Sequence, residues 1–460
     1  MQSHHSRNTA ARHLACVLML TVCPASLRAQ GQGAAQAEIE DPLLTLDDAV
    51  SLALINNRAV KNSALEAQKS DNQVNVARSR RLPKLQLDVL AGSLLHPFDF
   101  TFPAGSFGTY PSTGPIPSTD AKVNTPARFT TFTTAALDQP LSQLYKINLG
   151  IRATELGREI TREALRAERQ KVAADVRRAY FGLVASQAAV GAARQTVKTL
   201  VETQRVTTRY VAQRAVLRAD ALEVESRLSH SRYELSAAEN RLATQREMFN
   251  DLLGRDLTTR FRVEPMAEEA ASEMTLEAAR QRAAESRPEI RQAQAREKQA
   301  QYERRIAKAD YIPDLSASVR YVGFYNFEVL PRNVASAGVY LSWEPFDWGR
   351  RANKVAERTR ALEQAHNGAQ QTSSQVAIEV GATYRKWSEA SLLVQAARTG
   401  YEAATEQVRE TGDRYKLEAA LLRDLLQAQA RTTDAQFQYQ QALSSYWSAA
   451  ADLRRAIGDE

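Results

Sequence analysis

The residue types that most often carry out chemistry are few in this sequence and lie far apart. Beyond residue 29 the histidines are His96, His230 and His366, each far from the next. The sequence contains no His-Glu-x-x-His, no Gly-x-Ser-x-Gly, no phosphate loop and no dinucleotide fingerprint. Its many carboxylates alternate with arginines, which is typical of a solvated surface. The sequence therefore predicts neither an enzyme nor a protein with a cofactor or metal.

Both cysteines, Cys16 and Cys23, lie in an N-terminal targeting segment. Basic residues precede the apolar run Leu14–Val22, and Ala29 is a suitable small residue before a cleavage site. This pattern predicts a secretory signal peptide over residues 1–29, too short to span a bilayer. A lipid anchor on Cys23 is the open alternative, although such sites normally have a small residue where this chain has valine. The exported chain is then expected to contain no thiol and no disulfide.

The formal net charge is +7, but the charges are mixed rather than clustered. Pairs such as Arg158-Glu159, Arg162-Glu163 and Glu168-Arg169 place opposite signs side by side. Alternating signs indicate a salt-bridged helix surface in water. A nucleic-acid site would need basic residues gathered on one face, so nucleic acid is not an expected partner.

Two long stretches without proline predict the helices that dominate the chain. No proline occurs between Pro140 and Pro265, and none after Pro345. Because proline breaks helix interiors, these stretches predict helical hairpins over residues 141–254 and 346–458. In the second hairpin, residues recur every seven positions, which indicates a coiled-coil seam. Its two rows are Thr432, Tyr439, Tyr446, Leu453 and Ala435, Ala442, Ala449, Ala456.

Before each hairpin the hydrophobic period changes from helical to two, which predicts half-buried strands. The strands are expected over residues 84–94, 128–139, 314–325 and 336–344, with loops over 95–127 and 326–335. Six prolines between His96 and Pro126 are expected to exclude regular structure from the first loop.

The second half of the sequence repeats the first. Thr275 corresponds to Thr45 and Pro313 to Pro83, both at an offset of 230, and Asp424 corresponds to Asp220 at 204. Thr45 is also expected to cap the first helix, with Asp48 three residues on. After a linker over residues 30–44, the chain is thus predicted to contain two structural repeats, 45–265 and 266–460.

Four strands in an exported, mostly helical chain need an explanation. Two hairpins with open edges are not stable alone in water, and strands that span a bilayer must close into a barrel. Four strands are too few to enclose a pore, so several chains must contribute. Aromatic residues near the strand ends are candidates for the interfacial girdle, with ordinary strand packing as the alternative. These residues are Phe129, Phe132, Tyr321, Phe324, Tyr340 and Trp343.

With these features together, the chain resembles the TolC-like outer membrane efflux proteins. The resemblance covers the whole mature chain and is carried by the duplicated Thr-Leu start and by Pro83 and Pro313, each before a strand. The segment Leu341–Arg350 (LSWEPFDWGR) is similar to the family's passage from strand to helix.

The resemblance implies a fold class that is mostly α with a small β part. Long antiparallel coiled-coil helices would form a periplasmic α-barrel, and four strands per chain would contribute to a 12-stranded membrane β-barrel of a homotrimer. The implied function is a passive outer membrane exit duct of a tripartite efflux or type I secretion system, extending into the periplasm. The implied partners are outer membrane lipid, a periplasmic adaptor and an inner-membrane pump. A periplasmic or secreted coiled-coil scaffold without a barrel is the alternative.

The same resemblance points to the tips of the two helical hairpins as the place where the adaptor docks. The candidate tip residues are Arg209, Tyr210, Asp220, Arg414, Tyr415 and Asp424, with helix-end salt bridges and tyrosines of the coiled-coil seam as the alternative interpretation. Charged residues near the tips are candidates for a closed-state constriction: Glu202, Arg205, Glu406 and Arg409. The tips depart from the family pattern, which often has glycine and then Ser or Thr there. This chain has Gln213 and Val216 in the first tip, and Glu418 and Leu421 in the second.

Overall fold

The computed structural model describes most of the chain after residue 40. The described residues are 41–93, 95–125, 129–214, 217–265, 274–327, 331–417 and 419–459. Pro42–Glu460 form one compact unit, and the description below concerns that unit. The expected signal peptide, most of the linker, both cysteines, Val216 and Glu418 lie outside the described residues.

The two halves of the unit contain the same main elements in the same order. The first half has α1 (Leu46–Asn56), α2 (Arg58–Ser79), β2 (Lys84–Ser93), β7 (Phe129–Pro140), α3 (Gln143–Ala212) and α4 (Arg218–Leu252). The second half has α5 (Leu276–Ser286), α6 (Pro288–Ala309), β9 (Asp314–Tyr325), β10 (Asn333–Ser342), α7 (Arg350–Lys416) and α8 (Leu422–Ala456). Even the helix lengths agree: α1 and α5 have 11 residues each, α2 and α6 have 22, and α4 and α8 have 35.

The first helix of each half, α1 and α5, begins after a threonine that caps it. The Thr45 side chain accepts a hydrogen bond from the Asp48 amide at 3.2 Å, and Thr275 accepts one from the Ala278 amide at 3.3 Å. Each satisfies a donor that the first turn leaves free. The proline-free stretches form α3, of 70 residues, and α7, of 67 residues. No helix in the described part of the chain has a stretch long and apolar enough to cross a membrane.

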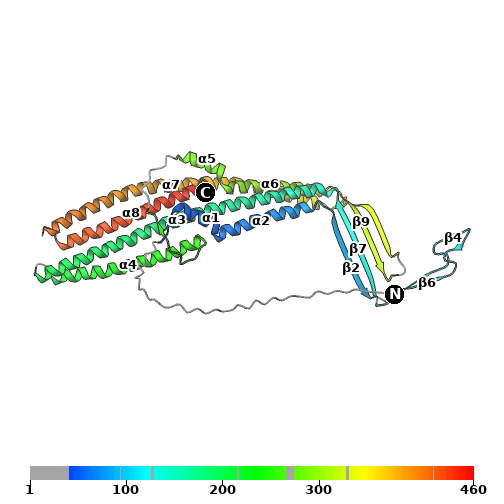
Figure 1. Ribbon diagram of the computed structural model, residues 1–460. Helices are drawn as coiled ribbons and strands as arrows, with labels where there is room; N and C mark the ends of the chain where they lie inside the picture. Colours follow the sequence, from blue (N-terminus) through cyan, green and yellow to red (C-terminus); the bar gives the residue numbers. More distant parts are fainter. Residues whose placement is uncertain are drawn as a thin grey trace, which may run out of the picture. The chain divides into compact units, whose positions relative to one another are not determined.

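The four long strands form one antiparallel sheet in the order β10-β9-β7-β2. Each strand is joined to one helix, and the helices contact one another in the matching order α7-α6-α3-α2. Sheet and helix layer are therefore two parts of one continuous wall. Figure 1 shows the long hairpins α3–α4 and α7–α8 running away from the sheet.

The first loop is not irregular, and that expectation was wrong. It contains an antiparallel pair, β3 (Phe98–Phe102) with β6 (Ala121–Thr125), and a short pair, β4 (Thr109–Tyr110) with β5 (Gly114–Pro115). The prolines flank these strands or lie at their ends, where a missing N–H removes no ladder hydrogen bond. β10 also begins three residues earlier than predicted. A two-residue parallel pair, β1 (Leu43–Leu44) with β8 (Arg262–Val263), carries too little pattern to predict.

The core is divided into clusters along the wall rather than gathered in one place. In the first half it is aromatic, with Tyr180, Phe181, Phe249 and Phe261 buried together. In the second half, small side chains pack around Trp387. The alanine row predicted for α8 is buried in its last three members: Ala442 is 2 % exposed, Ala449 1 % and Ala456 0 %.

Candidate functional site

The sheet has one apolar and one polar face. Residues opposite each other in antiparallel strands project to the same face, and the register keeps odd numbers opposite odd numbers. The odd face is mostly apolar: Leu85, Leu87, Val89, Ala91, Ala135, Leu137, Leu315, Ala317, Val319, Tyr321, Ala335, Ala337, Val339 and Leu341. All the charged residues of these strands lie on the even face: Lys84, Asp88, Asp138, Asp314 and Arg320.

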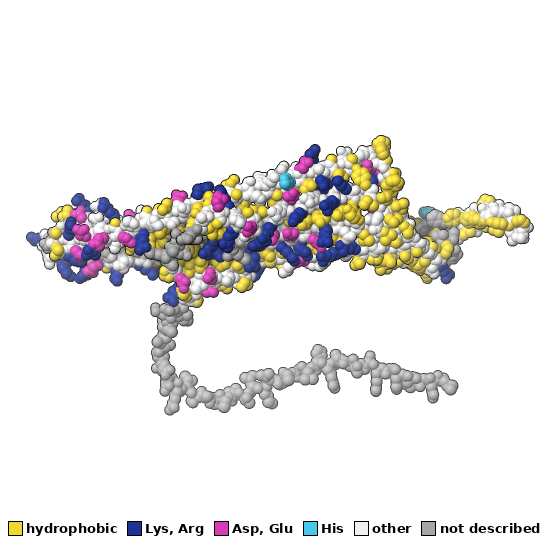
Figure 2. All heavy atoms as spheres, turned by 90° about the horizontal axis from the view of Figure 1, so that it is seen from above, with side chains coloured by type: hydrophobic (Ala, Val, Ile, Leu, Met, Phe, Trp, Pro, Cys, Tyr) yellow, Lys and Arg dark blue, Asp and Glu magenta, His cyan; other side chains and the backbone are white. Residues whose placement is uncertain are grey.

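The apolar face is open in the single chain. Leu85 is 73 % exposed, Leu87 66 % and Val339 67 %. In Figure 2 hydrophobic side chains gather at the sheet, whereas charged ones are spread over the helices. Strands of 10 to 12 residues match the length that a tilted membrane-spanning strand requires. The sheet therefore has an outer face suited to lipid and an inner face suited to water.

The register divides the six predicted girdle residues between the two faces. Phe129 and Tyr321 lie on the apolar face, and Trp343, which is 61 % exposed, follows β10 directly. Phe132 and Phe324 lie opposite each other on the polar face with ring centroids 5.2 Å apart, and Tyr340 is on that face too. The strand alternation alone could not separate these sets, because a face becomes outer or inner only once strands are paired.

Both edges of the sheet are open. Within the described residues, β10 pairs only with β9, and β2 pairs only with β7. Each edge is a ten-residue strand with a row of free backbone donors and acceptors. Exposed edges of this length pair readily with another chain, and lipid would not satisfy them.

At the other end of the wall, the predicted tip residues lie where each hairpin turns. Arg209 is exposed in the last turn of α3, and the Asp220 carboxylate accepts a hydrogen bond from the Leu217 amide at 3.2 Å. In the second hairpin, Arg414 is paired with Glu410 at 2.6 Å. Asp424 is exposed in the first turn of α8.

The two tips are packed against each other. The Tyr415 side chain of α7 is near Thr207, Tyr210 and Asp220 of the first hairpin. Burial raises the pKa of the Tyr415 hydroxyl, and the nearby Tyr210 and Asp220 raise it further. Further from the turns, a small apolar cluster also joins the two hairpins. It is formed by Leu200, Val224, Leu228 and Leu426. The structure thus brings together tyrosines that the sequence places two hundred residues apart.

The constriction candidates are paired within their own helices. The Arg205 guanidinium lies 2.6 Å from Glu202, and that of Arg409 lies 2.6 Å from Glu406. Each pair is exposed and occupies the same position in its hairpin. The hydrogen bond from Arg205 lowers the pKa of Glu202, and that from Arg409 lowers the pKa of Glu406. These residues therefore present charge at the surface without linking the two hairpins.

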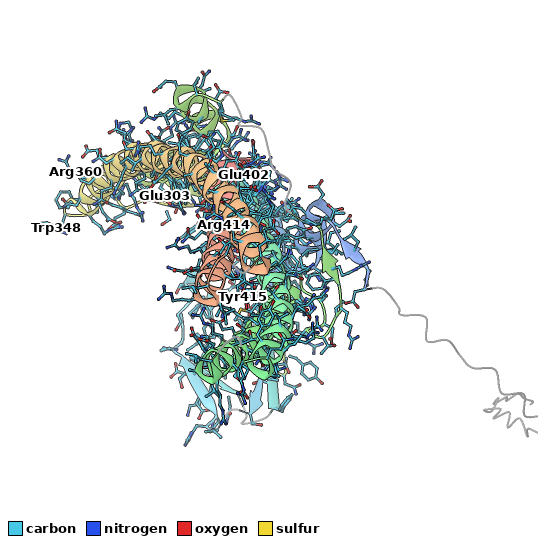
Figure 3. The ribbon with its side chains drawn as sticks, turned by 90° about the vertical axis from the view of Figure 1, so that its left-hand side faces the viewer. Glu303, Trp348, Arg360, Glu402, Arg414 and Tyr415 are labelled. Atoms are coloured by element: carbon cyan, nitrogen blue, oxygen red, sulfur yellow. The ribbon has the colours of Figure 1, made fainter. Side chains whose placement is uncertain are left out.

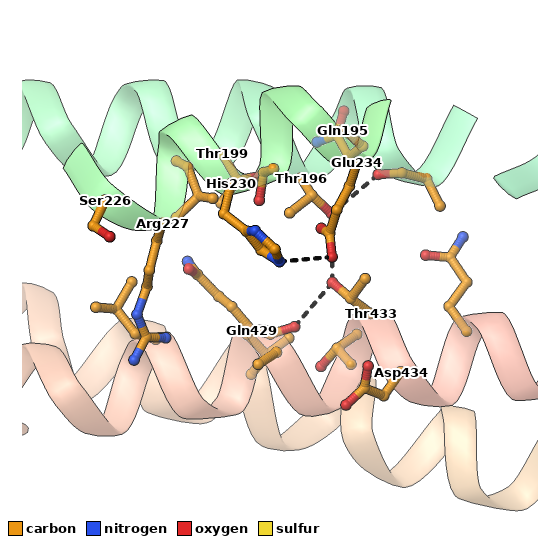
Figure 4. A pocket seen from close by; sticks show the side chains of 18 residues that line it. Gln195, Thr196, Thr199, Ser226, Arg227, His230, Glu234, Gln429, Thr433 and Asp434 are labelled. Atoms are coloured by element: carbon orange, nitrogen blue, oxygen red, sulfur yellow. Dashed lines mark hydrogen bonds and ion pairs between the residues drawn. The ribbon is translucent and has the colours of Figure 1, made fainter. Parts of the chain in front are cut away.

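A half-open cavity between the hairpins was not predicted from the sequence. It has a volume of about 700 Å³, and its lining includes the polar residues Thr196, Thr199, His230, Glu234, Gln429 and Thr433. Figure 4 shows His230 directed at Glu234, with 3.2 Å between Nε2 and Oε1. The spacing of four between this histidine and glutamate was the only available signal, because the lining combines residues of both hairpins, α3–α4 and α7–α8. Among the described residues, no three His, Cys, Asp or Glu side chains converge as a metal site would require.

A sheet with a lipid-facing side and a water-facing side, continuous with long helical hairpins, defines a membrane-spanning duct component. The family model of outer membrane efflux proteins matches residues 49–255 and 279–459, which are the two halves described above. The chain belongs to the outer membrane efflux protein family. It is an outer membrane exit duct of an efflux system, with an extension into the periplasm.

Solved channels have the same fold. The CmeC outer membrane channel of Campylobacter jejuni matches at 17 % identity with a TM-score of 0.73, covering 90 % of this chain and 85 % of that chain. The outer membrane protein VceC of Vibrio cholerae matches at 14 % identity and 0.69, covering 90 % and 96 %. The open state of the Neisseria gonorrhoeae MtrE channel matches at 17 % and 0.67, covering 90 % and 89 %. No curated protein sequence matches the chain.

Proposed function

We propose that three copies of this chain close into one passive duct. The observation that carries the proposal is the pair of open edges, β2 and β10, on a sheet with one apolar and one polar face. Pairing β10 of one copy with β2 of the next, three times over, gives twelve strands and leaves no free edge. The apolar face then contacts outer membrane lipid, and the polar face lines the lumen.

The duct works with a periplasmic adaptor and an inner-membrane pump, which supplies the energy. Arg209, Arg414 and Asp424 are exposed at the hairpin tips, the part of the wall furthest from the sheet. We assign adaptor docking to this end, with Tyr210, Asp220 and Tyr415 contributing to the same surface. No catalytic step is part of this role, because the duct only has to open and let substrate pass.

Opening requires the two hairpins of each chain to separate at the tips. The packing of Tyr415 near the first hairpin, and the cluster of Leu200, Val224, Leu228 and Leu426, would be rearranged in this movement. Glu202, Arg205, Glu406 and Arg409 lie within a few turns of the tips and would set the charge of the narrowest passage.

Export places the long first loop outside the cell. The signal peptide over residues 1–29 is removed, and the repeats 45–265 and 266–460 insert their strands together. The β3–β6 hairpin then lies at the cell surface, and Phe129, Tyr321 and Trp343 meet the edges of the lipid layer. Protease treatment of intact cells should cleave within residues 95–125. Complete protection of this segment would contradict the topology.

Native mass spectrometry of detergent-extracted outer membranes tests the assembly. We expect a trimer of chains that lack about the first thirty residues, together with conductance after insertion into planar bilayers. A monomer or dimer recovered by osmotic shock without detergent would overturn the duct. It would leave the coiled-coil scaffold as the function of the chain.

A further inference from the structure

The passage from β10 to α7 forms a rigid turn that exposes an aromatic pair. Trp348 has a φ of 57° and Gly349 a φ of 83°, so both are left-handed. This backbone conformation is unfavourable for a bulky residue. It persists because the Asp347 carboxylate accepts hydrogen bonds from the Gly349 amide at 3.2 Å and the Arg351 amide at 3.0 Å.

The turn is fixed from inside by a buried ion pair. Arg351 Nε lies 2.9 Å from Asp347, and their side chains are only 8 % and 12 % exposed. On the outside, Trp348 is 88 % exposed and Phe346 67 %, with their rings in edge contact at 4.8 Å. A turn that is well anchored on one side and leaves a tryptophan in solvent is typical of a surface that a partner covers.

The turn lies at a free edge of the wall. Figure 3 shows Trp348 at the outer end of the α7 arc, directed away from the rest of the chain. The corresponding passage inside the wall, from β7 to α3, has no such turn, because Pro140 ends the strand and Ser142 starts the helix at once. The aromatic turn is therefore found at the edge passage and not at the interior one.

At the interior passage from β7 to α3, the neighbouring strand β9 and the residues before it bind the start of the helix. Ser142 Oγ donates to the Pro313 carbonyl at 2.6 Å and accepts from the Leu315 amide at 2.8 Å. Lys146 pairs with Asp310. The start of β9 thus closes the passage from β7 to α3. In the repeat, residues 310–315 correspond to residues 80–85 at the start of β2, which is the other free edge.

Where the sheet joins the helices, the two free edges of the wall have complementary side chains. The turn at β10 includes Glu344, whose side chain is 56 % exposed and pairs through Oε2 with Arg350 of the same turn, which leaves Oε1 as a further acceptor. The edge at β2 begins with Arg81 and Leu82, both exposed. Within the described part of the chain, no ion pair or hydrogen bond involves the Arg81 side chain. Guanidinium groups stack on indole rings and pair with carboxylate oxygens, so the exposed Trp348 ring and Glu344 Oε1 are suitable partners for Arg81.

We propose that Glu344, Phe346 and Trp348 of one copy bind Arg81 and Leu82 of a second copy. This inference rests on the proposed trimer and names the contact that sets the periplasmic end of each subunit boundary. β10 runs toward the helices and β2 runs away from them, so antiparallel pairing of the edges brings these residues together. The Arg81 guanidinium lies on the Trp348 indole and beside the Glu344 carboxylate.

Crosslinking tests the contact, because both native cysteines lie in the expected signal peptide. The double variant Arg81→Cys/Trp348→Cys, treated with a short bis-maleimide, should give dimers and trimers on denaturing gels. The control Arg81→Cys/Tyr325→Cys uses an exposed aromatic at the far end of the sheet and should stay monomeric on the gel. A trimer in native mass spectrometry without this crosslink would overturn the inference and leave the duct intact. Absence of a trimer would overturn both.

Trimer dissociation in detergent measures the chemistry of the contact. Trp348→Ala should speed dissociation about tenfold across three boundaries, and Trp348→Phe should speed it less, since a phenyl ring still accepts a cation. Arg81→Glu should weaken the trimer more than Arg81→Ala, because it places a second carboxylate beside Glu344. Unchanged dissociation in Trp348→Ala would contradict the proposal. So would quenching of Trp348 by brominated lipid, which would assign the turn to the membrane instead.

Discussion

In both halves of the chain, the end of the long hairpin packs against the break between the two shorter helices. Different side chains stabilise this junction in the two halves. In each, a hairpin ends at a left-handed glycine that lies against the break between two helices: Gly254 at Asn56, and Gly458 at Ser286. In the first half, Asn57 caps α2 and its amide donates to the Leu252 carbonyl at 2.8 Å. In the second half, the residue at that place is Arg287.

Arg287 contacts more groups than Asn57 does, and two of these contacts are ion pairs. Its guanidinium donates to the Arg455 and Ala456 carbonyls, at 3.2 and 3.3 Å, and pairs with Glu289 and Glu379, each at 2.8 Å. The residue is only 3 % exposed. The two junctions therefore share the same backbone geometry. The polar side chain that donates to the carbonyl groups at the end of the hairpin differs between them. The second junction should therefore depend more on charge than the first.

The largest effect is expected from the two glycines. A Cβ at Gly254 would lie 2.4 Å from the Asn56 carbonyl oxygen, and one at Gly458 would lie 2.8 Å from Ser286 Cβ. With the left-handed backbone added, Gly254→Ala should lower the free energy of unfolding by about 3 kcal/mol and Gly458→Ala by about 2 kcal/mol. Denaturant unfolding measures both. Gly191→Ala, in an open helical position, is the control and should not destabilise. Equal tolerance at all three sites would contradict the shared junction.

Because the second junction contains ion pairs and the first does not depend on them to the same degree, the two junctions should also differ in what their polar residues contribute to stability. Arg287→Ala leaves two carbonyls without their buried donor and leaves Glu379 paired with Arg455 alone, so it should cost about 3 kcal/mol. Asn57→Ala removes a cap and one long-range hydrogen bond and should cost about 1–2 kcal/mol. Thermal unfolding of both variants checks the order. If Asn57→Ala proved the more damaging, the second junction would not depend on its ion pairs.

The returning helices should differ in their tolerance of larger side chains. Ala442 of α8 is 2 % exposed, and the corresponding Ala238 of α4 is only partly buried. Overpacking should make Ala442→Leu cost about 2 kcal/mol, Ala449→Leu a similar amount, and Ala238→Leu about 1 kcal/mol or less. Unchanged stability and unchanged assembly of the two α8 variants would refute the close-packed alanine row.

A tyrosine links each long helix to the segment before its half: Tyr180 is buried, and Tyr384 is partly buried. The Tyr180 hydroxyl donates to the Leu44 carbonyl and accepts from the Glu264 amide, both at 3.1 Å, whereas Tyr384 donates to the Met274 carbonyl alone, at 3.1 Å. Tyr180→Phe should cost about 1–2 kcal/mol and Tyr384→Phe about 1 kcal/mol. Equilibrium unfolding of the two variants, with wild type alongside, gives the difference.

The same tyrosine predicts a pH dependence. Burial raises the pKa of Tyr180 above that of the unfolded chain. A raised pKa contributes stability that is fully present below the unfolded value, about pH 10, and is lost as the pH rises further. Wild type should therefore lose stability above that pH more steeply than Tyr180→Phe. Parallel curves for the two proteins would show that Tyr180 is not the group responsible.

The smallest effect on stability is expected near the hairpin tips, where the two halves have the same Glu–Arg pair. Glu202→Gln and Glu406→Gln each break an exposed ion pair within one helix, so neither should change stability measurably. Ion selectivity in planar bilayers is the informative measurement. If the pairs line the passage, both variants should reduce the preference for cations. A change in only one of them would show that the hairpins are not equivalent at the constriction.

Much of the architecture follows from local patterns in the sequence. Proline spacing marked the hairpins, alternation marked the four strands, and β9 spans the predicted residues 314–325. Thr45 caps the first helix as expected, by accepting from the Asp48 amide. The β3–β6 hairpin was missed because prolines at strand ends look, in sequence, like prolines that exclude strands.

The sequence by itself determined which segments are helix or strand and that the pattern is repeated, because propensity, capping and periodicity act over a few residues. Only the tertiary structure decided which face of the sheet Phe132 and Tyr321 occupy, because a strand has no inside until its register is set. It also brought Tyr415 beside Tyr210 and left Arg81 and Trp348 at opposite free edges. Such placements depend on contacts between residues far apart in the chain, and no local pattern encodes them.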